Sequence, residues 1–479
     1  MDTLPNHILI LGSGVFGLST AFALSKRPLF TETKISVLDK SDFPALDGSS
    51  IDTSRIIRPD YKDPAYASLA AHASDAWRKQ GDDELGGQGR YNENGLMLVA
   101  NRGVQGEEYV TKSLENARRL AKPGDEDSVV YLKDRLAIDK HARTGGGSGH
   151  WGYINKRSGW ADAEAAMRWL HKQAEATNRI EFLTGTAESF LIDENDHQKV
   201  IGVRLTDDTI IAADLVIVAT GAWTGKLVDL SGRAQATGQV LCYMDITDEE
   251  QEKLKDIPTL LNMSEGMFII PPRNNLLKVA RHGYGYTNPV SVTQPATPNA
   301  LRSDTNGAVE TNYTNGVNGA NGYTNRHSKV QVSMPRTKLD DPNLWVPQEG
   351  EEACRKALSE MIPSLADRAF SKSKICWYTD TPTADFIITY HPDYSSKSLF
   401  MATGGSGHGF KFLPVLGEKI ADCVEGRCPE EFKQKWKWPE NKVDEVVTHD
   451  GSRGGRCGMN LDEEVRKEGR VAGKRDFEL

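Results

Sequence analysis

The chain lacks a long apolar run and an excess of positive charge. No apolar stretch approaches the roughly 20 residues that a helix needs to cross a bilayer. The formal net charge is −9 at pH 7, a sign that does not favour binding to nucleic acid or to anionic membranes. We therefore expect no nucleic acid and no membrane among the partners of this protein.

Cysteine is scarce and is not arranged as a metal site. The chain has six cysteines and no Cys-x-x-Cys pair. Cys423 and Cys428 are the most closely spaced two, but they are isolated from other ligand types, so they do not predict a zinc site. The interpretation that remains is a set of reduced thiols in an intracellular protein without a bound metal.

Glycine is abundant, and one cluster of it lies near the start of the chain. The motif Gly12-Ser-Gly-Val-Phe-Gly17 follows the apolar residues 8–11 and precedes a helical pattern. A strand that leads through such a turn into a helix presents backbone N–H groups and a positive helix end to an anion. A second strand, residues 33–38, ends at Asp39, about 20 residues beyond the turn, where a carboxylate typically binds a ribose hydroxyl. The pattern predicts a dinucleotide site, and Asp39 disfavours a 2′-phosphate on its ribose.

A second glycine-rich turn, Gly404–Lys411, follows the apolar residues 399–403 near the other end of the chain. Because it repeats the strand–turn–helix order, it predicts a second anion-binding turn. Two such turns indicate a long cofactor held by both ends of the chain. A third strand, residues 214–219, leads into Thr220-Gly-Ala-Trp223; it either returns the chain beneath the nucleotide or is simply another central strand.

The length favours two closely joined domains, since 479 residues exceed what one core usually holds. We expect an α/β protein in which a Rossmann-type dinucleotide-binding domain is interleaved with a substrate domain built on a mixed or antiparallel sheet. The dinucleotide-binding domain, which the resemblance given below makes an FAD-binding domain, is expected at 1–90, 155–235 and 370–438, and the substrate domain at 91–154 and 236–369. The Asn/Gly-rich residues 304–327 are expected to form a disordered insert and residues 439–479 a loose tail. Residues 105–145 are expected to be helical and to end in a flexible link at 145–149.

Three basic residues are candidates for binding an anionic substrate or cofactor. Arg55 and Arg58 lie in Arg55-Ile-Ile-Arg58, where one guanidinium could meet a phosphate or flavin edge and the other a carboxylate. The alternative is an ordinary surface salt bridge. Lys411 comes directly after the second glycine turn and would strengthen an anion site there, unless it is a solvated surface lysine.

Lys278, His282 and Cys376 are further candidates with ordinary structural alternatives. Lys278 lies inside a short apolar strand, and His282 lies four residues further on, so strand alternation puts both on one side. The lysine either extends to solvent or stays partly desolvated, and a histidine at a core edge is more often structural. Cys376, judged from its residue type alone, is expected to be a small buried apolar side chain.

Taken together, these segments resemble the monomeric sarcosine oxidase family of FAD-dependent amine oxidases, which includes saccharopine, pipecolate and fructosyl amino acid oxidases. The motifs are Arg55-Ile-Ile-Arg58, Lys278-x-x-x-His282, Cys376-Trp-Tyr-Thr-Asp-Thr-Pro382 and Ser406-Gly-His-Gly-Phe-Lys411. The resemblance covers residue 7 to Trp438 except the Asn/Gly-rich insert.

The resemblance implies roles for the candidate residues. It implies that Cys376 carries FAD covalently through its sulfur at the flavin 8α-methyl group. It implies that Lys278 lies over the flavin ring and activates oxygen, where an ammonium stabilises developing superoxide. Family members of the sarcosine type carry a histidine a few residues before the arginine pair, and this chain has Ile51 in that region.

The same resemblance implies which residues contact the substrate and the rest of the cofactor. Arg58 and Lys411 would hold the substrate carboxylate, and His282 would lie beside the substrate amine. The expected cofactor-binding residues are Gly12, Gly14, Val15, Phe16, Gly17, Asp39, Lys40, Ser49, Ser54, Arg55, Ala187, Thr220, Gly221, Trp223, Cys376, Gly405, Gly407, His408, Gly409 and Lys411.

The implied reaction is oxidation of an N-substituted amino acid, either N-methyl or secondary, by oxygen. The neutral amine would pass a hydride equivalent to FAD, giving an imine and then hydrogen peroxide, in what could be a biosynthetic pathway. Saccharopine, pipecolate and fructosyl amino acid oxidation are alternatives within the family, as is a flavin dehydrogenase that uses a carrier acceptor. A nicotinamide dehydrogenase and a non-catalytic flavoprotein are the alternatives outside it.

We expect a monomer that acts in the cytoplasm. The first apolar run belongs to the nucleotide fold, so it does not indicate a secretory signal. Relatives of this group often end in a peroxisomal Ser-Lys-Leu signal, whereas this chain ends in Asp-Phe-Glu-Leu479. A peroxisomal location is the alternative.

Overall fold

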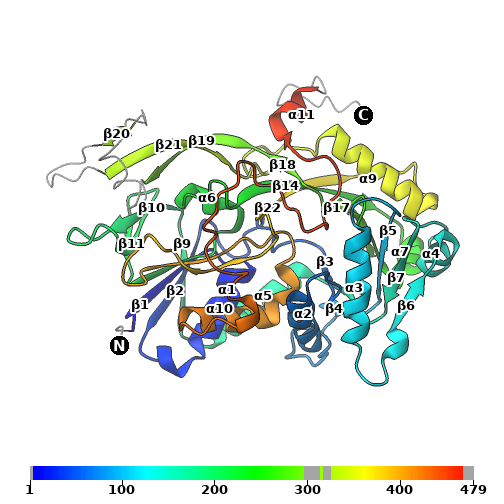
Figure 1. The fold of residues 1–479 in the computed structure, drawn as a ribbon, viewed down its shortest axis with the longest axis horizontal. Coiled ribbons are helices and arrows are strands. Elements are labelled where there is room, and N and C mark those ends of the chain that lie inside the picture. The colour runs from blue at the N-terminus through cyan, green and yellow to red at the C-terminus, as the bar shows by residue number, and fades with distance from the viewer. Residues whose placement is uncertain (1–3, 296–312, 317–324, 468–479) are drawn as a thin grey trace.

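The computed structural model describes residues 4–295, 313–316 and 325–467. Two large sheets dominate this part of the chain, and each combines strands that are far apart in the sequence (Figure 1). One sheet is mostly parallel and the other is mixed, which confirms the expected α/β class. No helix in these ranges has both the length and the apolarity to cross a membrane.

The mostly parallel sheet carries both glycine-rich turns at the ends of its strands. Its strand order is β23-β24-β13-β1-β2-β9. Because such sheets are covered on both faces, their strands are apolar throughout, and β13 is buried at every residue. The strands are β1 (His7–Leu11), β2 (Lys34–Asp39), β9 (Ile180–Thr184), β13 (Leu215–Val218), β23 (Ile387–Tyr390) and β24 (Leu399–Thr403), of which β23 is antiparallel.

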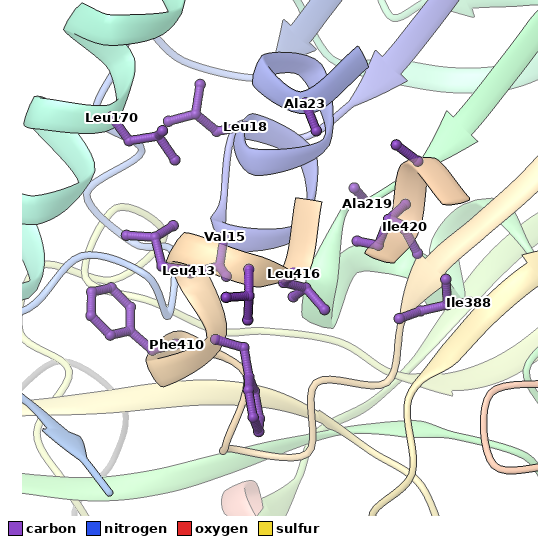
Figure 2. Packing of buried hydrophobic residues seen from close by; sticks show 14 of the residues in the cluster. Val15, Leu18, Ala23, Leu170, Ala219, Ile388, Phe410, Leu413, Leu416 and Ile420 are labelled. Atoms are coloured by element: carbon purple, nitrogen blue, oxygen red, sulfur yellow. The ribbon is translucent and has the colours of Figure 1, made fainter. Parts of the chain in front are cut away.

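Three helices pack together beside this sheet: α1 (Val15–Ser25), α5 (Ala163–Ala176) and α10 (Leu413–Val424). Figure 2 shows Leu18 of α1 next to Leu170 of α5, and Leu413 and Leu416 of α10 close to Val15 at the start of α1. The α1–α10 contact is so close that a Cβ atom at Gly417 would lie 2.0 Å from the Ser19 carbonyl oxygen. The helices that follow the two glycine turns are therefore held side by side.

The mixed sheet has the order β25-β18-β14-β17-β16-β15-β5-β7-β6, and β22 pairs with β14. The helix α9 (Gln348–Met361) packs on β14, β16 and β17 and buries its Ala357 and Leu358 there. The strands are β5 (Leu96–Ala100), β6 (Val129–Leu132), β7 (Trp151–Asn155), β14 (Gln235–Asp245), β15 (Thr259–Asn262), β16 (Met267–Arg273), β17 (Leu276–Arg281), β18 (Tyr286–Thr287), β22 (Lys372–Asp380) and β25 (Met459–Asn460).

Smaller sheets and helices complete the described chain. The small sheets are formed by β3 (Arg55–Ile57), β8 (Gly159–Ala161) and β4 (Tyr91–Asn92); by β10 (Ala187–Ile192), β11 (Val200–Leu205) and β12 (Ile210–Ala212); and by β19 (Pro289–Pro295), β21 (Asn325–Ser333) and β20 (Tyr313–Gly316). The other α-helices are α2 (Pro64–Trp77), α3 (Glu107–Arg119), α4 (Arg135–Ala142), α6 (Thr224–Leu227), α7 (Asp248–Leu254) and α11 (Leu461–Lys467).

The region 105–149 differs from its expectation in two ways. It is not helical throughout, because β6 separates α3 from α4 and pairs with β7. Its glycine-rich end is packed rather than flexible: residues 146–149 are buried, and a Cβ atom at Gly146 would lie 2.2 Å from the Glu360 carbonyl oxygen. Glycine here permits close backbone packing, which composition alone does not distinguish from a flexible link.

The expected insert at 304–327 contains paired strands. β20 pairs with β21 in antiparallel register, with Tyr313 opposite Ser328, and β21 begins at Asn325. The expectation of disorder is therefore wrong for residues 313–316 and 325–327. The other residues of the expected insert, 304–312 and 317–324, lie outside the described residues.

The segment from residue 439 to 467 is packed against the domain, so the expectation of a loose tail is wrong for it. β25 pairs with β18, and α11 lies close to α9 (Figure 1). The Arg453 side chain is 1% exposed and donates to the Asp380 carboxylate over 2.6 Å. A charged sequence with many glycines indicates a loose tail, unless one of its charges pairs with an opposite charge buried in the domain. Here Asp380 is that buried partner, and the sequence alone does not show the pairing. Residues 468–479 lie outside the described part of the chain.

We predict that Arg453→Ala lowers the free energy of unfolding by about 3–5 kcal/mol, because it leaves the buried Asp380 carboxylate without its partner. Urea denaturation measures this change. Arg427→Ala is the matched control, since Arg427 pairs with acidic residues while 57% exposed, and such pairs contribute about 1 kcal/mol or less. Equal, small effects of the two substitutions would show that residues 439–467 do not stabilise the fold.

Candidate active site and cofactor cavity

A cavity of about 610 Å³ lies between the two glycine-rich turns. That volume is in the range of pockets that bind small molecules and cofactors. Most of the residues that the sequence predicts for the cofactor line it: Gly12, Gly14, Val15, Phe16, Asp39, Lys40, Ser49, Arg55, Ala187, Thr220, Gly221, Trp223, Gly405, Gly407 and Gly409.

The two turns contact each other through Phe16. Cβ atoms at Gly405 and Gly409 would lie 3.2 and 2.9 Å from the Phe16 ring. Gly12 has φ +101°, and a Cβ atom there would lie 2.5 Å from the Ala219 carbonyl oxygen, so no larger residue fits this turn. The absence of side chains at the glycines that line the cavity permits the close approach of a pyrophosphate to the backbone.

Acidic and aromatic groups line another part of the cavity. Asp39 accepts hydrogen bonds from the backbone N–H and the hydroxyl of Ser13, over 2.7 and 2.6 Å. These bonds fix the carboxylate at the end of β2, where a ribose hydroxyl is typically bound. The Lys40 ammonium lies 3.7 Å from the centre of the Trp223 ring and forms an ion pair with Asp47. The cavity thus has the donor and acceptor groups that an FAD molecule requires.

The other predicted residues lie outside the lining of this cavity. Gly17 is a packing residue, because a Cβ atom there would lie 1.8 Å from the Gly12 carbonyl oxygen. Ser54 offers its carbonyl oxygen to Lys278 over 2.9 Å, and His408 bonds to Tyr61 over 3.0 Å. Cys376 is buried beside the cavity, since its neighbours Trp377 and Tyr378 line it.

Arg58 and Lys411 form a buried cationic pair around the Tyr61 ring. Lys411 Nζ donates to the Tyr61 hydroxyl over 2.9 Å, and the Arg58 guanidinium lies 4.9 Å from the centre of that ring. Arg58 Nη2 donates to the Tyr109 hydroxyl over 3.3 Å, whereas its Nη1 is buried without a hydrogen-bond partner. The sequence-predicted carboxylate ligands therefore do lie together, and two of their neighbours are tyrosines.

The cationic pair has no carboxylate partner among the residues that the structure describes. Burial, and then the charge of Arg58, lower the pKa of Lys411 well below that of an exposed lysine. Removing two cations from water without an anion is costly. The arrangement is therefore electrostatically suited to bind a small anion, and a carboxylate matches the guanidinium fork.

A second cluster lies on one face of the mixed sheet. Tyr243 of β14 stands opposite Lys278 of β17, and Cys376 of β22 stands opposite Gln239 of β14. Since side chains alternate along a strand, Tyr243, Lys278 and Cys376 all lie on the same face. The loop before β3 crosses this face and brings Asp52 and Arg55 onto it.

The carboxylate of Asp52 joins the members of this second cluster. It forms ion pairs with Lys278, over 2.5 Å, and with Arg55, and it accepts a hydrogen bond from the Tyr243 hydroxyl over 2.6 Å. Arg55 Nη2 also lies 3.4 Å from the Cys376 sulfur. Burial lowers the pKa of Lys278 to about 8, although Asp52 opposes this change.

His282 belongs to a third group, which includes the C-terminal segment. Its Nδ1 and Nε2 lie 3.4 Å from Arg453 Nη1 and from the Ser452 hydroxyl. Burial first, and then the charges of Arg453 and Arg58, lower the pKa of His282 well below its ordinary value. A neutral imidazole is thus held beside the cationic pair, where it could accept a hydrogen bond from a substrate amine.

Sequence reasoning missed Asp52, Tyr61, Tyr109, Asp380 and Arg453. Asp52 lies three residues before Arg55, and an acid so close to a candidate arginine pair was an available signal. The two tyrosines carry no signal of their own in the sequence, whereas Asp380 lies within the motif Cys376-Trp-Tyr-Thr-Asp-Thr-Pro382. Arg453 lies in a segment whose composition indicates a tail, so only its contact with Asp380 reveals it.

The sequence matches the family described as FAD dependent oxidoreductase over residues 7–423. The amino acid oxidase fsqB of Aspergillus fumigatus is 30% identical, over 88% of this chain and 93% of the relative. The L-saccharopine oxidase of Schizosaccharomyces pombe is also 30% identical, over 91% and 93%.

A solved structure supports the same assignment. The fructosamine oxidase Amadoriase II of Aspergillus fumigatus has a TM-score of 0.72 and 25% identity, covering 96% of this chain and 95% of the other. The match over residues 7–423, the cavity between two glycine turns and the similarity to oxidases agree with one another. The chain therefore belongs to the FAD dependent oxidoreductase family and is a flavin-dependent amine oxidase.

Proposed function

We propose that this enzyme oxidises the C–N bond of an N-substituted amino acid, and that Arg58 and Lys411 bind its carboxylate. The observation that carries the proposal is the buried cationic pair, which lacks a carboxylate in the described chain and includes an unpartnered Arg58 Nη1. A bound amino acid carboxylate would supply the missing negative charge and accept from both cations. His282, held neutral nearby, would face the amine.

The overall reaction balances as follows. The substrate loses two electrons and two protons, with one hydrogen leaving nitrogen and one leaving the adjacent carbon, and becomes an imine. Oxygen gains two electrons and two protons and becomes hydrogen peroxide, while water hydrolyses the imine to an amine and a carbonyl compound. Bound FAD would supply the redox chemistry, as acceptor of the hydride equivalent and donor of electrons to oxygen. The protein provides orientation and fixed charges.

Cys376 is the proposed point of covalent attachment to FAD. The sulfur is buried next to two residues that line the cavity, and Arg55 places a positive charge 3.4 Å from it. Cations beside a sulfur favour its reaction as a nucleophile. Lys278 is proposed to face oxygen, because an ammonium fixed in a dry site stabilises negative charge as it develops there.

N-methyl and other secondary amino acids are the proposed substrates, and saccharopine-type substrates are a second candidate. The second candidate is favoured by the similarity to the L-saccharopine oxidase, and oxidation of an amino acid by the similarity to the amino acid oxidase fsqB. Peroxide release with N-methyl amino acids, pipecolate, saccharopine and fructosyl amino acids separates these possibilities. Activity on a fructosyl amino acid alone would agree with oxidation of an N-substituted amino acid but would contradict both N-methyl and saccharopine-type substrates.

We predict that Arg58→Met raises KM for an amino acid substrate roughly 100-fold, because a charge-assisted hydrogen bond to the carboxylate is lost. The same substitution changes KM much less for the matching amine that lacks a carboxylate. Steady-state peroxide assays measure both values. Arg427→Met is the control, since Arg427 is an exposed residue at the end of α10. An equal increase with both substrates would show that Arg58 does not bind the carboxylate.

We predict that acid precipitation leaves the yellow colour with the unaltered protein and releases it from the Cys376→Ala variant. Only a covalent bond survives unfolding, so the visible spectra of pellet and supernatant report the attachment. Cys354→Ala is the matched control, because Cys354 is equally buried but packs in a different cluster. Colour released from the unaltered protein would retain the flavoenzyme assignment and remove this role of Cys376.

We predict that Lys278→Met slows reoxidation of the reduced enzyme by oxygen at least about 100-fold, while reduction by substrate changes by less than about tenfold. Stopped-flow absorbance follows the two half-reactions separately. Lys374→Met is the control, since Lys374 is a nearby lysine that donates to backbone carbonyls instead of Asp52. Equal slowing of both half-reactions would contradict the oxygen role, and rapid reoxidation only by an added carrier would favour a dehydrogenase.

A further inference from the structure

The Asp52 carboxylate is the only acidic group that the described structure pairs with Lys278 or Arg55. Its side chain is 2% exposed, and that of Lys278 is 3% exposed. One oxygen, Oδ2, contacts both cations, while Oδ1 accepts from the Tyr243 hydroxyl and from the Thr53 backbone N–H, over 2.6 and 2.7 Å. Both oxygens therefore accept hydrogen bonds, and four donors hold the carboxylate in place.

The two cations that Asp52 holds belong to different parts of the proposed chemistry. Lys278 extends from β17 and has a second acceptor in the Ser54 carbonyl oxygen, over 2.9 Å. Arg55 begins β3, donates to the Ser49 carbonyl oxygen over 2.6 Å, and reaches the Cys376 sulfur with the same Nη2. A single buried carboxylate thus lies between the proposed oxygen-facing ammonium and the proposed flavin-bearing sulfur.

We infer that Asp52 is a positioning residue that holds Lys278 as an ammonium and holds Arg55 against Cys376, so that one carboxylate supports both oxygen reduction and flavin attachment. This inference rests on the function proposed above for Lys278 and Cys376. Asp52 itself is not placed in contact with substrate, so its effects must pass through Lys278 and Arg55.

The charges around Lys278 explain why this ammonium needs a partner. Asp52 and Arg55 come from the loop before β3 and from β3 itself, Tyr243 from β14 and Cys376 from β22, while the Phe268 ring of β16 lies 5.8 Å away. Burial and the Arg55 charge lower the pKa of Lys278 to about 8, and Asp52 is the group that opposes them most. In turn, Lys278 and Arg55 hold the pKa of Asp52 well below its usual range, although burial opposes this.

The first test is the pH dependence of reoxidation by oxygen. In the unaltered enzyme the rate is expected to fall as pH rises through about 8, because the Lys278 ammonium loses its proton there. Asp52→Asn removes the nearby negative charge, so the midpoint moves down by one pH unit or more and reoxidation at pH 8 slows about fivefold or more. Reduction by substrate is expected to change by less than about threefold. An unchanged midpoint in Asp52→Asn would overturn the inference.

Two further variants separate position from charge. Tyr243→Phe removes a hydrogen bond to Asp52 without removing charge, and its midpoint is expected to stay at that of the unaltered enzyme. Asp52→Glu retains the charge but displaces the ammonium, so reoxidation slows severalfold while the midpoint stays. If Asp52→Asn does not fold, Asp52→Glu provides the test instead. A reoxidation rate of Asp52→Glu equal to that of the unaltered enzyme would then contradict a positioning role for Asp52.

A double-mutant cycle distinguishes failure of this inference from failure of the proposed function. If Asp52 acts through Lys278, adding Asp52→Asn to Lys278→Met leaves reoxidation within about twofold of Lys278→Met alone. If Lys278→Met alone does not slow reoxidation, the proposed oxygen role fails. If Lys278→Met slows it and Asp52→Asn does not, only the assignment of Asp52 fails.

The Arg55 contact has its own measurement, which does not depend on turnover. The share of flavin that stays with acid-precipitated protein is expected to fall in Asp52→Asn, because Arg55 loses the partner that holds it near the Cys376 sulfur. Tyr243→Phe is expected to retain the full share. Melting temperatures of the same preparations show whether a lower share of attached flavin results from general unfolding. If Asp52→Asn retained the full share of attached flavin, the part of the inference that concerns Arg55 would be overturned.

Discussion

The close packing of α1 on α10 is the constraint on which the cavity depends. Each helix follows a glycine-rich turn, and the two turns are separated by most of the chain. Gly417 permits the backbones to approach at Ser19, and Phe16 fills the space beside Gly405 and Gly409. Because the helix starts are fixed side by side, residues of both glycine-rich turns line one cavity instead of two separate anion sites.

The charge distribution follows from where the mixed sheet meets this cavity. The short strand β3 connects the two clusters, since Arg55 at its start contacts Asp52 and Cys376, and Arg58 directly after its end joins Lys411 around Tyr61. One of these clusters contains a buried carboxylate that pairs with both of its cations, and the other has no carboxylate within ion-pair distance in the described chain. The groups proposed to act on the cofactor therefore have a permanent counter-ion in the protein. The groups proposed to bind substrate have none, and the substrate carboxylate would supply it.

The sequence predicts the local elements of the nucleotide site better than it predicts the long-range contacts. The turn at Gly12, the helix after it and Asp39 follow a spacing that backbone geometry imposes within one βαβ unit. Arg453 illustrates the opposite case, because its partner Asp380 lies 73 residues away and no local pattern joins them. The composition of residues 439–467 therefore indicates a tail, and only the contact with the Asp380 carboxylate shows that the segment is packed. Likewise, glycine at 146 indicates flexibility by composition but serves close packing in the fold.

The uncompensated pair also determines what the site can reject. In the free enzyme, the buried Arg58 N–H group without a partner and the desolvated Lys411 ammonium raise the free energy of the empty pocket. In the proposed binding mode, a substrate carboxylate would remove this penalty, whereas an amine without one would leave both groups buried and without an anion. Discrimination would then come mainly from the cost that remains when the anion is missing, and not from the attraction alone. A pocket that works in this way would accept varied groups on nitrogen and still require an amino acid.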